Sequence, residues 1–388
     1  MENLKKVSIL FLGSQMATGG GQEILFSQAS WFEAQGYRVM AAFFYDREDL
    51  YPQWQTRCEF PLLDLQSWKQ GGGWRNLFRL MRGLVRLYRL IRKERFDIVE
   101  TFTHHANLLG MPVAWLAGAR GRVATHHGRV ENFSPPLVYL HRQVINQGIA
   151  TDLVVVSKQV QQVAIEQERI RPERITIITN GINTLPVTPL SEAEKVSLRQ
   201  SLRVGTSDLL LLTVARLQPQ KGHTYLLDAI PRILQAVPQA LFVFAGDGPL
   251  CEELQAKAHA LSVEHAVRFI GVYTEIPQLL QTADVFVLPS LWEGLPVAML
   301  EAMLAGIPVV ASQVEGVEEV IQNDENGLLV PPGDPEALSR ALIQLLQDRS
   351  AQEKLGAAGK ATVEKEYTAE RMCRSYEELF TNRLSLTG

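Results

Sequence analysis

Residues 283–312 read ADVFVLPSLWEGLPVAMLEAMLAGIPVVAS. Short apolar runs lie near both ends of this stretch, at 285–288 and 308–311, and a run of Ala, Leu and Met lies between them. Short apolar runs bounded by Pro and Gly are typical of buried strands, whereas Ala, Leu and Met favour helix. The stretch therefore predicts a strand, a helix and a second strand parallel to the first.

The same alternation runs through the rest of the chain. Further strands are expected at 7–12, 39–44, 97–100, 122–125 and 153–156, and then at 209–214, 241–245 and 267–270. Such alternation produces parallel sheets covered by helices on both faces. The two series predict an α/β fold of two doubly wound, Rossmann-like domains that face a cleft, with ligands beyond the carboxyl ends of the strands.

A segment rich in Pro and polar residues separates the two series. It contains Pro186, Pro189, a polar run at 191–194 and Gly205, which together predict a linker with one short helix. We expect an N-terminal domain at 1–184, this linker at 185–207 and a C-terminal domain at 208–388. From residue 350 onward the pattern predicts helices only, and these final helices are candidates for packing back on the N-terminal domain.

Composition narrows the class of protein. The 388 residues are 46% hydrophobic and 21% charged, as in ordinary globular proteins, and the apolar runs are far shorter than a membrane-spanning helix requires. The cysteines Cys58, Cys251 and Cys373 lie far apart and form no C-x-x-C pair, which speaks against a disulfide framework or a structural zinc site. The N-terminus lacks a signal-peptide pattern. A cytoplasmic protein is expected.

Charge is distributed unevenly between the halves. Residues 1–183 hold 22 Lys and Arg against 16 Asp and Glu, a net charge of +6. Residues 184–388 hold 16 against 26, a net charge of −10. A basic half joined to an acidic half indicates that the two halves meet different ligands.

Two cations follow the predicted strand at 209–214. Arg216 and Lys221 stand five residues apart in ARLQPQKGH. At the carboxyl end of a strand and before a helix, a planar guanidinium and a point-charge ammonium suit a diphosphate. The alternative is an ordinary solvated basic turn.

Two carboxylates lie in the opening stretch. Glu293 falls in the loop after the strand at 285–288, and Glu301 falls in the next helix among Ala, Met and Leu residues. A carboxylate in so apolar a helix is costly unless it is paired or bound to hydroxyl groups. The two could therefore accept hydrogen bonds from hydroxyls of one ligand. Ordinary surface glutamates are the alternative.

Glycines and a histidine mark other strand ends. Gly20 and Gly21 precede a helix, where backbone N–H groups can approach an anion, although a flexible turn explains them as well. Gly246 and Gly248 permit a tight turn beside a ligand or a simple strand-to-helix connection. His127 follows the strand at 122–125, but its neighbour His126, and also His104 and His105, compete for a role at the cleft.

Several chemistries lack their sequence signatures. No D-x-D pair is present to hold a metal on a nucleotide, and no cluster of histidines and carboxylates has metal-ligand spacing. There is also no G-x-S-x-G or Cys/His nucleophile signature. The sequence predicts neither a bound metal nor hydrolase chemistry of these kinds.

Residues 74–95, WRNLFRLMRGLVRLYRLIRKER, predict a basic amphipathic helix. Such a helix can lie on an anionic membrane surface. Alternatively, its apolar residues pack on the N-terminal sheet while the arginines are solvated. No nucleic-acid-binding motif accompanies the charge. The cations that form one helical stripe are Arg75, Arg79, Arg82, Arg86, Arg89 and Lys93.

Taken together, these stretches resemble the retaining glycosyltransferases of family 4, which have the two-domain GT-B architecture. The resemblance covers nearly the whole chain. Its most specific part is residues 283–312, followed by EGVEE at 315–319 and NGLLV at 326–330. Residues 216–222, 246–249 and 180–182 agree in order, and one departure is Asn183, where the family often has Asp.

The resemblance implies a UDP- or GDP-linked sugar bound mainly by the C-terminal domain, with no cofactor and no metal. Arg216 and Lys221 would neutralise the diphosphate and the leaving group. Glu301 would hold the ribose hydroxyls and Glu293 those of the transferred sugar. The remaining implied contacts are the backbone at Gly294, Leu295 and Pro296, the glycines Gly246 and Gly248, the phosphate-side glycines Gly20 and Gly21, and His127 near the sugar.

The implied reaction is sugar transfer with retention of configuration to a glycan or lipid-linked acceptor. Synthesis of bacterial cell-surface polysaccharide or lipopolysaccharide at the inner membrane face is the expected setting. A transferase acting on a soluble small acceptor, a GT-B-fold epimerase or hydrolase of nucleotide sugars, and a non-catalytic sugar-nucleotide-binding protein are the alternatives.

Overall fold

The computed structural model describes residues 7–17, 19–127, 134–184 and 188–386. The chain forms two compact units, which we describe separately. The N-terminal unit comprises Met1–Asn183 and Ala369–Gly388, and the C-terminal unit comprises Thr184–Thr368. Within the described residues, each helix is too short or too polar to cross a bilayer.

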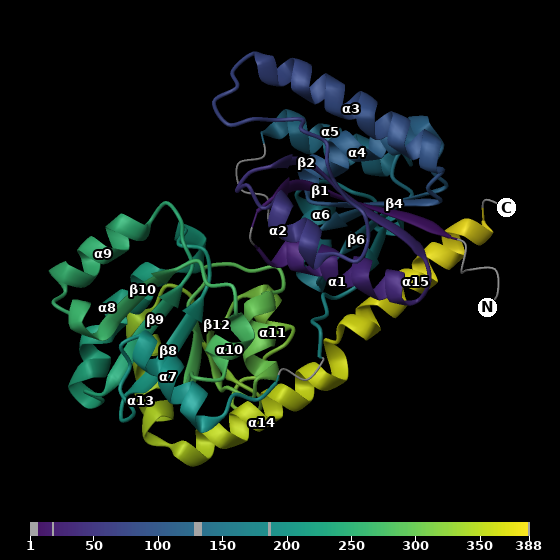
Figure 1. Ribbon diagram of the computed structural model, residues 1–388. Coiled ribbons are helices and arrows are strands. Elements are labelled where there is room, and N and C mark those ends of the chain that lie inside the picture. Colours follow the sequence, from purple (N-terminus) through teal and green to yellow (C-terminus); the bar gives the residue numbers. More distant parts are fainter. Residues whose placement is uncertain (1–6, 18, 128–133, 185–187, 387–388) are drawn as a thin grey trace. The chain divides into compact units, whose positions relative to one another are not determined.

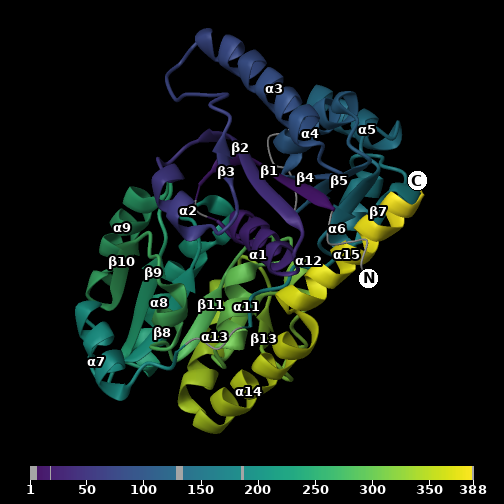
Figure 2. The same cartoon turned by 45° about the vertical axis from the view of Figure 1, so that its right-hand side comes forward.

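The N-terminal unit is a seven-stranded parallel sheet with the order β3-β2-β1-β4-β5-β6-β7. In Figures 1 and 2, helices α3, α4 and α5 cover one face of this sheet, and α1 and α15 lie together on the other. The strands are β1 (Ser8–Met16), β2 (Arg38–Asp46), β3 (Leu62–Asp64), β4 (Ile98–Phe102), β5 (Gly121–His126), β6 (Asp152–Val155) and β7 (Ile175–Ile177). The helices are α1 (Gly20–Ala34), α2 (Tyr51–Arg57), α3 (Arg75–Glu94), α4 (His104–Ala117), α5 (Pro135–Asn146), α6 (Lys158–Glu166), the short η2 (Pro172–Arg174) and α15 (Ala369–Ser385).

The C-terminal unit is a six-stranded parallel sheet with the order β10-β9-β8-β11-β12-β13. Helices α8, α9 and α13 pack over one face, and α14 packs on α11. The strands are β8 (Leu209–Val214), β9 (Ala240–Ala245), β10 (Val267–Gly271), β11 (Val285–Leu288), β12 (Val309–Ser312) and β13 (Leu328–Val330). The helices are α7 (Glu192–Ser201), α8 (His223–Ala236), α9 (Cys251–Ala260), α10 (Ile276–Leu280), α11 (Val297–Leu304), α12 (Glu315–Glu318), α13 (Pro335–Gln347) and α14 (Arg349–Glu366), with short η3 (Pro219–Lys221) and η4 (Glu264–Ala266).

The predicted α/β fold of two doubly wound domains is confirmed. All ten expected strands are present, and apart from one exception each begins and ends within two residues of the expected positions. The exception is the first strand, expected at 7–12, which continues through Gly13 to Met16. Gly13 lies under the Phe43 ring, which occupies the space that a Cβ would need. The glycine therefore permits close packing between β1 and β2 rather than ending the strand. The sequence analysis missed β3, β7 and β13, which are three residues long and too short to show a periodic pattern.

The segment expected as a linker is packed on the C-terminal unit. Helix α7 begins with a capping box at Ser191 and Glu194. Near its end the Arg199 guanidinium donates to the carbonyl of Thr282 at 2.8 Å and pairs with Asp284 at 3.4 Å. These contacts fix α7 at the amino end of β11, so residues 188–207 belong to the C-terminal unit.

The final helix belongs to the N-terminal unit, so the C-terminal unit ends at Thr368 rather than at 388. Helix α15 packs against α1. Its Arg383 forms a double hydrogen bond with the buried Asp152 of β6, at 2.5–2.9 Å. The Tyr37 hydroxyl donates to Glu377 at 2.6 Å. Polar contacts to two separate parts of the unit thus hold the last helix in place.

A buried carboxylate also lies under α15. Glu100 of β4 is fully buried, and the Gln28 amide donates to both of its oxygens at 3.1 and 3.2 Å. Burial raises the pKa of Glu100 well above its usual value, although hydrogen bonds from Gln28 and Tyr376 oppose the shift. Because the pKa of Glu100 is raised, the folded protein keeps this carboxyl group protonated at higher pH than the unfolded chain does.

We therefore expect Glu100 to lower stability as pH rises. Above its unfolded pKa the unfolded chain releases the proton and the folded protein retains it, so the free energy of unfolding falls until the folded pKa is reached. Glu100→Gln should remove this dependence of stability on pH. The thermal midpoint of the variant minus that of wild type should therefore increase as the pH rises from about 5 to about 8. The exposed Glu378→Gln on α15 is the control, and parallel pH curves for wild type and Glu100→Gln would contradict the assignment.

Candidate active site

The strand order of the C-terminal sheet reverses between β8 and β11. From β8 the chain continues outward to β9 and β10, whereas from β11 it continues in the other direction to β12 and β13. In open parallel sheets, ligands bind at such a point, beyond the carboxyl ends of the two central strands. The charged residues that the sequence analysis singled out in this unit lie in the loops and helices that follow these two strands, and Gly246 and Gly248 follow the neighbouring β9.

Glycines allow the loops to pack backbone against backbone. Gly222 has a φ of +65°, and a Cβ there would overlap the carbonyl of Pro289 in the loop after β11. Gly246, with a φ of +147°, lies in the same way against the carbonyl of Ala215, and Gly248 lies against that of Leu217. Gly246 and Gly248 thus bring the β9 loop onto the β8 loop, a packing role that the sequence analysis did not identify.

Two sequence-predicted residues form a partly buried ion pair. Lys221 Nζ lies 2.6 Å from Glu293 Oε1, and the Ser290 hydroxyl donates to the same oxygen at 2.6 Å. Glu293 is 7% exposed, and the Lys221 side chain is 21% exposed. Gln220 strengthens this junction, because its side-chain amide donates to the carbonyl of Trp292 at 3.0 Å. An ammonium has three donors, so Lys221 can hold Glu293 and still donate to a phosphate.

The other predicted donor-site residues flank this pair. Arg216 is half-buried two residues beyond β8, and Glu301 is half-buried in the second turn of α11. The backbone from Gly294 to Pro296 leads into the N-terminus of α11, where helix N–H groups favour negative charge. The structure thus places all of these residues around the ends of β8 and β11.

The N-terminal sheet reverses its strand order between β1 and β4. Gly20 and Gly21 form the first turn of α1, a short loop beyond β1, and a Cβ added to Gly21 would meet no atom within 4 Å. The space beside this helix end is open. The preceding Thr18 lies outside the described residues.

His127 has one defined hydrogen bond. The Thr125 hydroxyl donates to the carbonyl of Thr101 at 2.9 Å and therefore accepts from His127 Nε2 at 2.9 Å. The imidazole stacks on Phe102, with ring centres 5.7 Å apart. Burial, aided by the nearby His126, lowers the pKa of His127 to about 4. Its Nδ1 is then an acceptor, and it has no hydrogen-bond partner within the described residues.

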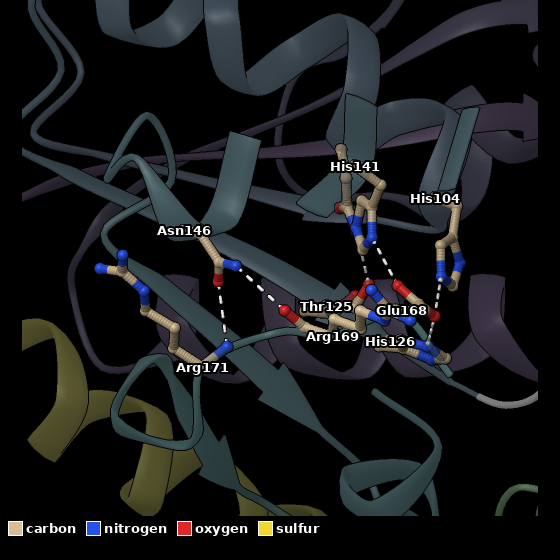
Figure 3. A network of polar contacts seen from close by, with 9 residues as sticks. His104, Thr125, His126, His141, Asn146, Glu168, Arg169 and Arg171 are labelled. Atoms are coloured by element: carbon tan, nitrogen blue, oxygen red, sulfur yellow. Dashed lines mark hydrogen bonds and ion pairs between the residues drawn. The ribbon is translucent and has the colours of Figure 1, made fainter. Parts of the chain in front are cut away.

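His126 points into a different environment from its neighbour. Figure 3 shows His104, His126 and His141 arranged around the Glu168 carboxylate. Oε1 lies 2.7 Å from His126 Nε2 and 3.2 Å from His104 Nε2, and Oε2 lies 2.8 Å from His141 Nδ1. Burial raises the pKa of Glu168, but the three histidine hydrogen bonds outweigh this effect and hold it far below the usual value.

The sequence has no cluster of histidines and carboxylates with metal-ligand spacing, but the fold assembles such a cluster from distant positions. His104, His126, His141 and Glu168 come from α4, β5, α5 and the loop after α6. His126 and His104 stand 42 and 64 residues from Glu168 in sequence. No local spacing could reveal such a cluster, because only the order of the strands brings these positions together.

Helix α3 exposes an apolar as well as a basic surface. Of its residues, only Asn76, Gly83, Leu87 and Ile91 are buried. Arg75 and Arg82 are exposed, whereas Arg79 and Arg86 are half-buried and donate to Asn76, Leu65 and Gln66. The exposed large apolar residues on and beside α3 are Trp68, Trp74, Leu77, Phe78, Met81, Val85 and Tyr88. Of the two alternatives for this helix, packing on the N-terminal unit accounts only for its few buried apolar side chains.

Family models match both halves of the chain. "Glycosyltransferase Family 4" matches residues 18–184, and "Glycosyl transferases group 1" matches residues 194–362. The UDP-Gal:alpha-D-GlcNAc-diphosphoundecaprenol alpha-1,3-galactosyltransferase of Escherichia coli is 30% identical over 282 residues, which are 71% of this chain and 72% of that protein. The chain belongs to glycosyltransferase family 4.

Two further comparisons agree with this assignment. The glycosyltransferase is 30% identical over 289 residues to the GDP-mannose-dependent alpha-(1-6)-phosphatidylinositol monomannoside mannosyltransferase of Mycobacterium tuberculosis, covering 72% of this chain and 74% of that one. Its fold matches the crystal structure of Anabaena HepE in complex with UDP-glucose, with a TM-score of 0.85 and 23% identity, over 97% of this chain and 99% of that chain. The GT-B fold is confirmed.

Removing Lys221 should destabilise the glycosyltransferase because Glu293 would remain buried without its cation. We expect Lys221→Ala to lower the free energy of unfolding by about 1–3 kcal/mol. Adding Glu293→Gln should restore part of this loss. Lys257→Ala, which breaks the more exposed Lys257–Asp228 pair, is the control and should cost less than about 1 kcal/mol. Equal losses for the two lysine variants in denaturant unfolding would refute the argument.

Proposed function

We propose that this glycosyltransferase moves a sugar from a nucleotide-diphosphate sugar to a glycan or lipid-linked acceptor, with retention of configuration. The observation that carries the proposal is the set of charged groups at the switch point of the C-terminal sheet. Arg216 and Lys221 follow β8, and Glu293 and Glu301 follow β11. Cations for a diphosphate thus lie beside carboxylates that can accept from hydroxyl groups.

The proposed donor contacts follow from these positions. Arg216 and Lys221 bind the diphosphate and stabilise the charge that develops on it, so that the donor site needs no divalent metal. Glu301 accepts from the ribose hydroxyls, and Glu293 accepts from those of the transferred sugar. The N-terminus of α11 at Gly294, Leu295 and Pro296 faces the donor, and Gly246 and Gly248 hold the adjoining loop in place.

Two groups of the N-terminal unit complete the proposal. His127 is neutral near pH 7, and its Nδ1 acceptor suits a hydroxyl of the transferred sugar. His126 is engaged by Glu168, which favours His127 over His126 for this role. The open first turn of α1 supports Gly20 and Gly21 as N–H donors to phosphate oxygens.

The proposed reaction uses attack on the face from which the diphosphate departs. The bond from the anomeric carbon to the diphosphate oxygen breaks through an oxocarbenium-like state, and a bond from the same carbon to the acceptor oxygen forms. The acceptor proton passes to the departing phosphate oxygen, and the nucleoside diphosphate leaves. No protein nucleophile takes part in this step.

The names of the relatives support the proposed substrate classes. One relative's name specifies UDP-Gal and a diphosphoundecaprenol-linked sugar, and the other's specifies GDP-mannose and a phosphatidylinositol monomannoside. A UDP- or GDP-linked donor and a lipid-linked acceptor, in synthesis of a cell-surface polysaccharide or lipopolysaccharide, are therefore proposed here also. A soluble small acceptor is the second candidate.

Donor binding tests the C-terminal site. We expect one of a panel of UDP-, GDP- and ADP-sugars to bind the purified protein in calorimetry and to be hydrolysed slowly. Arg216→Ala/Lys221→Ala should weaken binding by about 100-fold or more, because two charge-assisted contacts are lost. Lys257→Ala/Arg340→Ala removes the same charge from the surface of the same unit and should bind normally.

Two outcomes would contradict the donor-site assignment. One is a folded wild-type protein that binds none of the panel, and the other is equal binding by both double variants. Added Mg²⁺ or Mn²⁺ should leave donor turnover unchanged, and strong activation would refute a metal-free donor site. Release of free sugar or of an epimer at full rate without acceptor would favour the epimerase or hydrolase alternative.

We further propose that α3 rests on an anionic membrane surface. Exposed Trp74, Phe78 and Tyr88 suit the interface, while exposed Arg75, Arg82 and other cations attract acidic lipids. Exposed apolar residues also occur on neighbouring helices: Trp115 and Leu116 on α4, and Tyr139 and Leu140 on α5. Peripheral attachment of this kind would bring the enzyme to a lipid-linked acceptor.

Vesicle cosedimentation tests the membrane surface. The wild type should bind phosphatidylglycerol vesicles more strongly than phosphatidylcholine vesicles. Arg75→Glu/Arg82→Glu/Arg89→Glu should reduce binding by at least about tenfold, since each basic residue contributes about 1 kcal/mol. The control Arg232→Glu/Arg340→Glu/Arg349→Glu changes exposed arginines of the C-terminal unit. A wild type that ignores both vesicle types would favour the soluble acceptor.

A further inference from the structure

The histidine cluster of the N-terminal unit has no part in the proposed transfer reaction. Its members are almost completely buried: His126 and His141 are 0% exposed, and His104 and Glu168 are 7% exposed. Three imidazoles around one carboxylate are an unusual content for a protein interior, where charged groups are seldom found without a partner. The protonation states and geometry of the cluster indicate what it can bind.

Asn107 fixes the proton on His141. The Asn107 carbonyl oxygen accepts from the Thr101 hydroxyl at 2.6 Å, and its amide donates to the carbonyl of Thr125 at 2.9 Å. The same amide group reaches His141 Nε2 at 3.1 Å, so this nitrogen is an acceptor. The His141 proton therefore sits on Nδ1 and is donated to Glu168 Oε2 at 2.8 Å.

The other two histidines share the second carboxylate oxygen. His126 Nε2 and His104 Nε2 lie 2.7 and 3.2 Å from Glu168 Oε1. One ligand atom from each of His104, His126 and Glu168 lies within 4.8 Å of the other two. With bonds of about 2.0–2.1 Å, two ligands of a tetrahedral zinc ion lie roughly 3.3 Å apart. The distances from Oε1 to the two histidine nitrogens are thus already near the spacing that a metal requires.

Contacts outside the cluster hold the Glu168 segment in place (Figure 3). The Asn146 amide at the end of α5 donates to the carbonyl of Arg169 at 3.1 Å, and its oxygen accepts from the backbone of Arg171 at 3.0 Å. Arg169 adopts a φ of +57°, which turns the chain directly after Glu168. The carboxylate is therefore positioned by the loop as well as by the histidines.

We propose that His104, His126 and Glu168 bind a zinc-type divalent cation inside the N-terminal unit. The ion would replace the two protons that the histidines donate to Oε1, and its charge would compensate the buried carboxylate. Two imidazoles and one carboxylate suit Zn²⁺ and its first-row neighbours, whereas Mg²⁺ and Ca²⁺ prefer oxygen ligands alone. His141, oriented by Asn107, is a positioning residue that holds the carboxylate through its other oxygen.

The proposal goes beyond the transfer reaction and is independent of it. The ion would join the start of α4, the end of β5 and the loop after α6, and His127 directly follows β5. Its role would be to fix the end of β5, which His127 directly follows. The proposed donor groups Arg216 and Lys221 belong to the other unit. Metal content and thermal stability can therefore be measured without any sugar donor.

Elemental analysis and cobalt titration test the site, with full-length protein carrying no histidine tag. We expect about one equivalent of Zn²⁺ in protein produced with zinc. After chelation, Co²⁺ should give visible absorption bands that saturate near one equivalent, and Zn²⁺ should raise the thermal midpoint. The proposal would be overturned if the folded wild-type protein shows neither bound metal nor a cobalt spectrum. The cluster would then be a hydrogen-bond network without a metal ion.

Variants separate the ligands from their support. His104→Gln and Glu168→Gln, checked for folding by circular dichroism, should each lose the cobalt bands and the zinc-dependent midpoint shift. His259→Gln removes a surface histidine of the C-terminal unit and should behave as wild type. His141→Gln should retain the cobalt spectrum but weaken affinity by about 10–100-fold. Unchanged metal binding in folded His104→Gln and Glu168→Gln would place the ion elsewhere.

Discussion

In both sheets the strand order reverses between two adjacent parallel strands, β1 and β4 in one unit and β8 and β11 in the other. The connections that leave the two strands run to opposite sides, so the loops at their carboxyl ends diverge and leave space for a ligand. In the C-terminal unit Gly222 then brings the β8 loop against the backbone beyond β11. Lys221 and Glu293 meet only because of this close approach.

The buried carboxylates of this protein have different neighbours. Glu100 lies among neutral partners and has a raised pKa, whereas Glu168 is surrounded by three histidines and has a strongly lowered one. Glu293 is paired with a lysine and a serine. Burial disfavours the charged form of both Glu100 and Glu168, so their neighbouring donors decide which of these two carboxylates stays ionised. Glu168, which stays ionised beside nitrogen donors, is suited to binding a cation.

Two helices of the N-terminal unit, α3 and α15, differ in how much of their apolar surface is covered. Helix α3 buries few side chains and leaves aromatic and basic residues exposed together. Helix α15 does the opposite, because its buried face packs on α1 and its polar contacts reach Tyr37 and Asp152. An amphipathic pattern alone does not distinguish these two helices. The packing partners in the fold decide which apolar face is covered.

The sequence by itself determined the α/β class, the ten longer strands and the positions of the charged residues proposed to bind the donor, because these signals are local. Periodic apolar runs specify strands and helices, and Arg216, Lys221, Glu293 and Glu301 stand close to the strands that position them. Only the tertiary structure decided the short strands, the membership of α15 and the cluster around Glu168. These depend on contacts between residues far apart in the chain, such as the 64 positions between His104 and Glu168, which no spacing rule can anticipate.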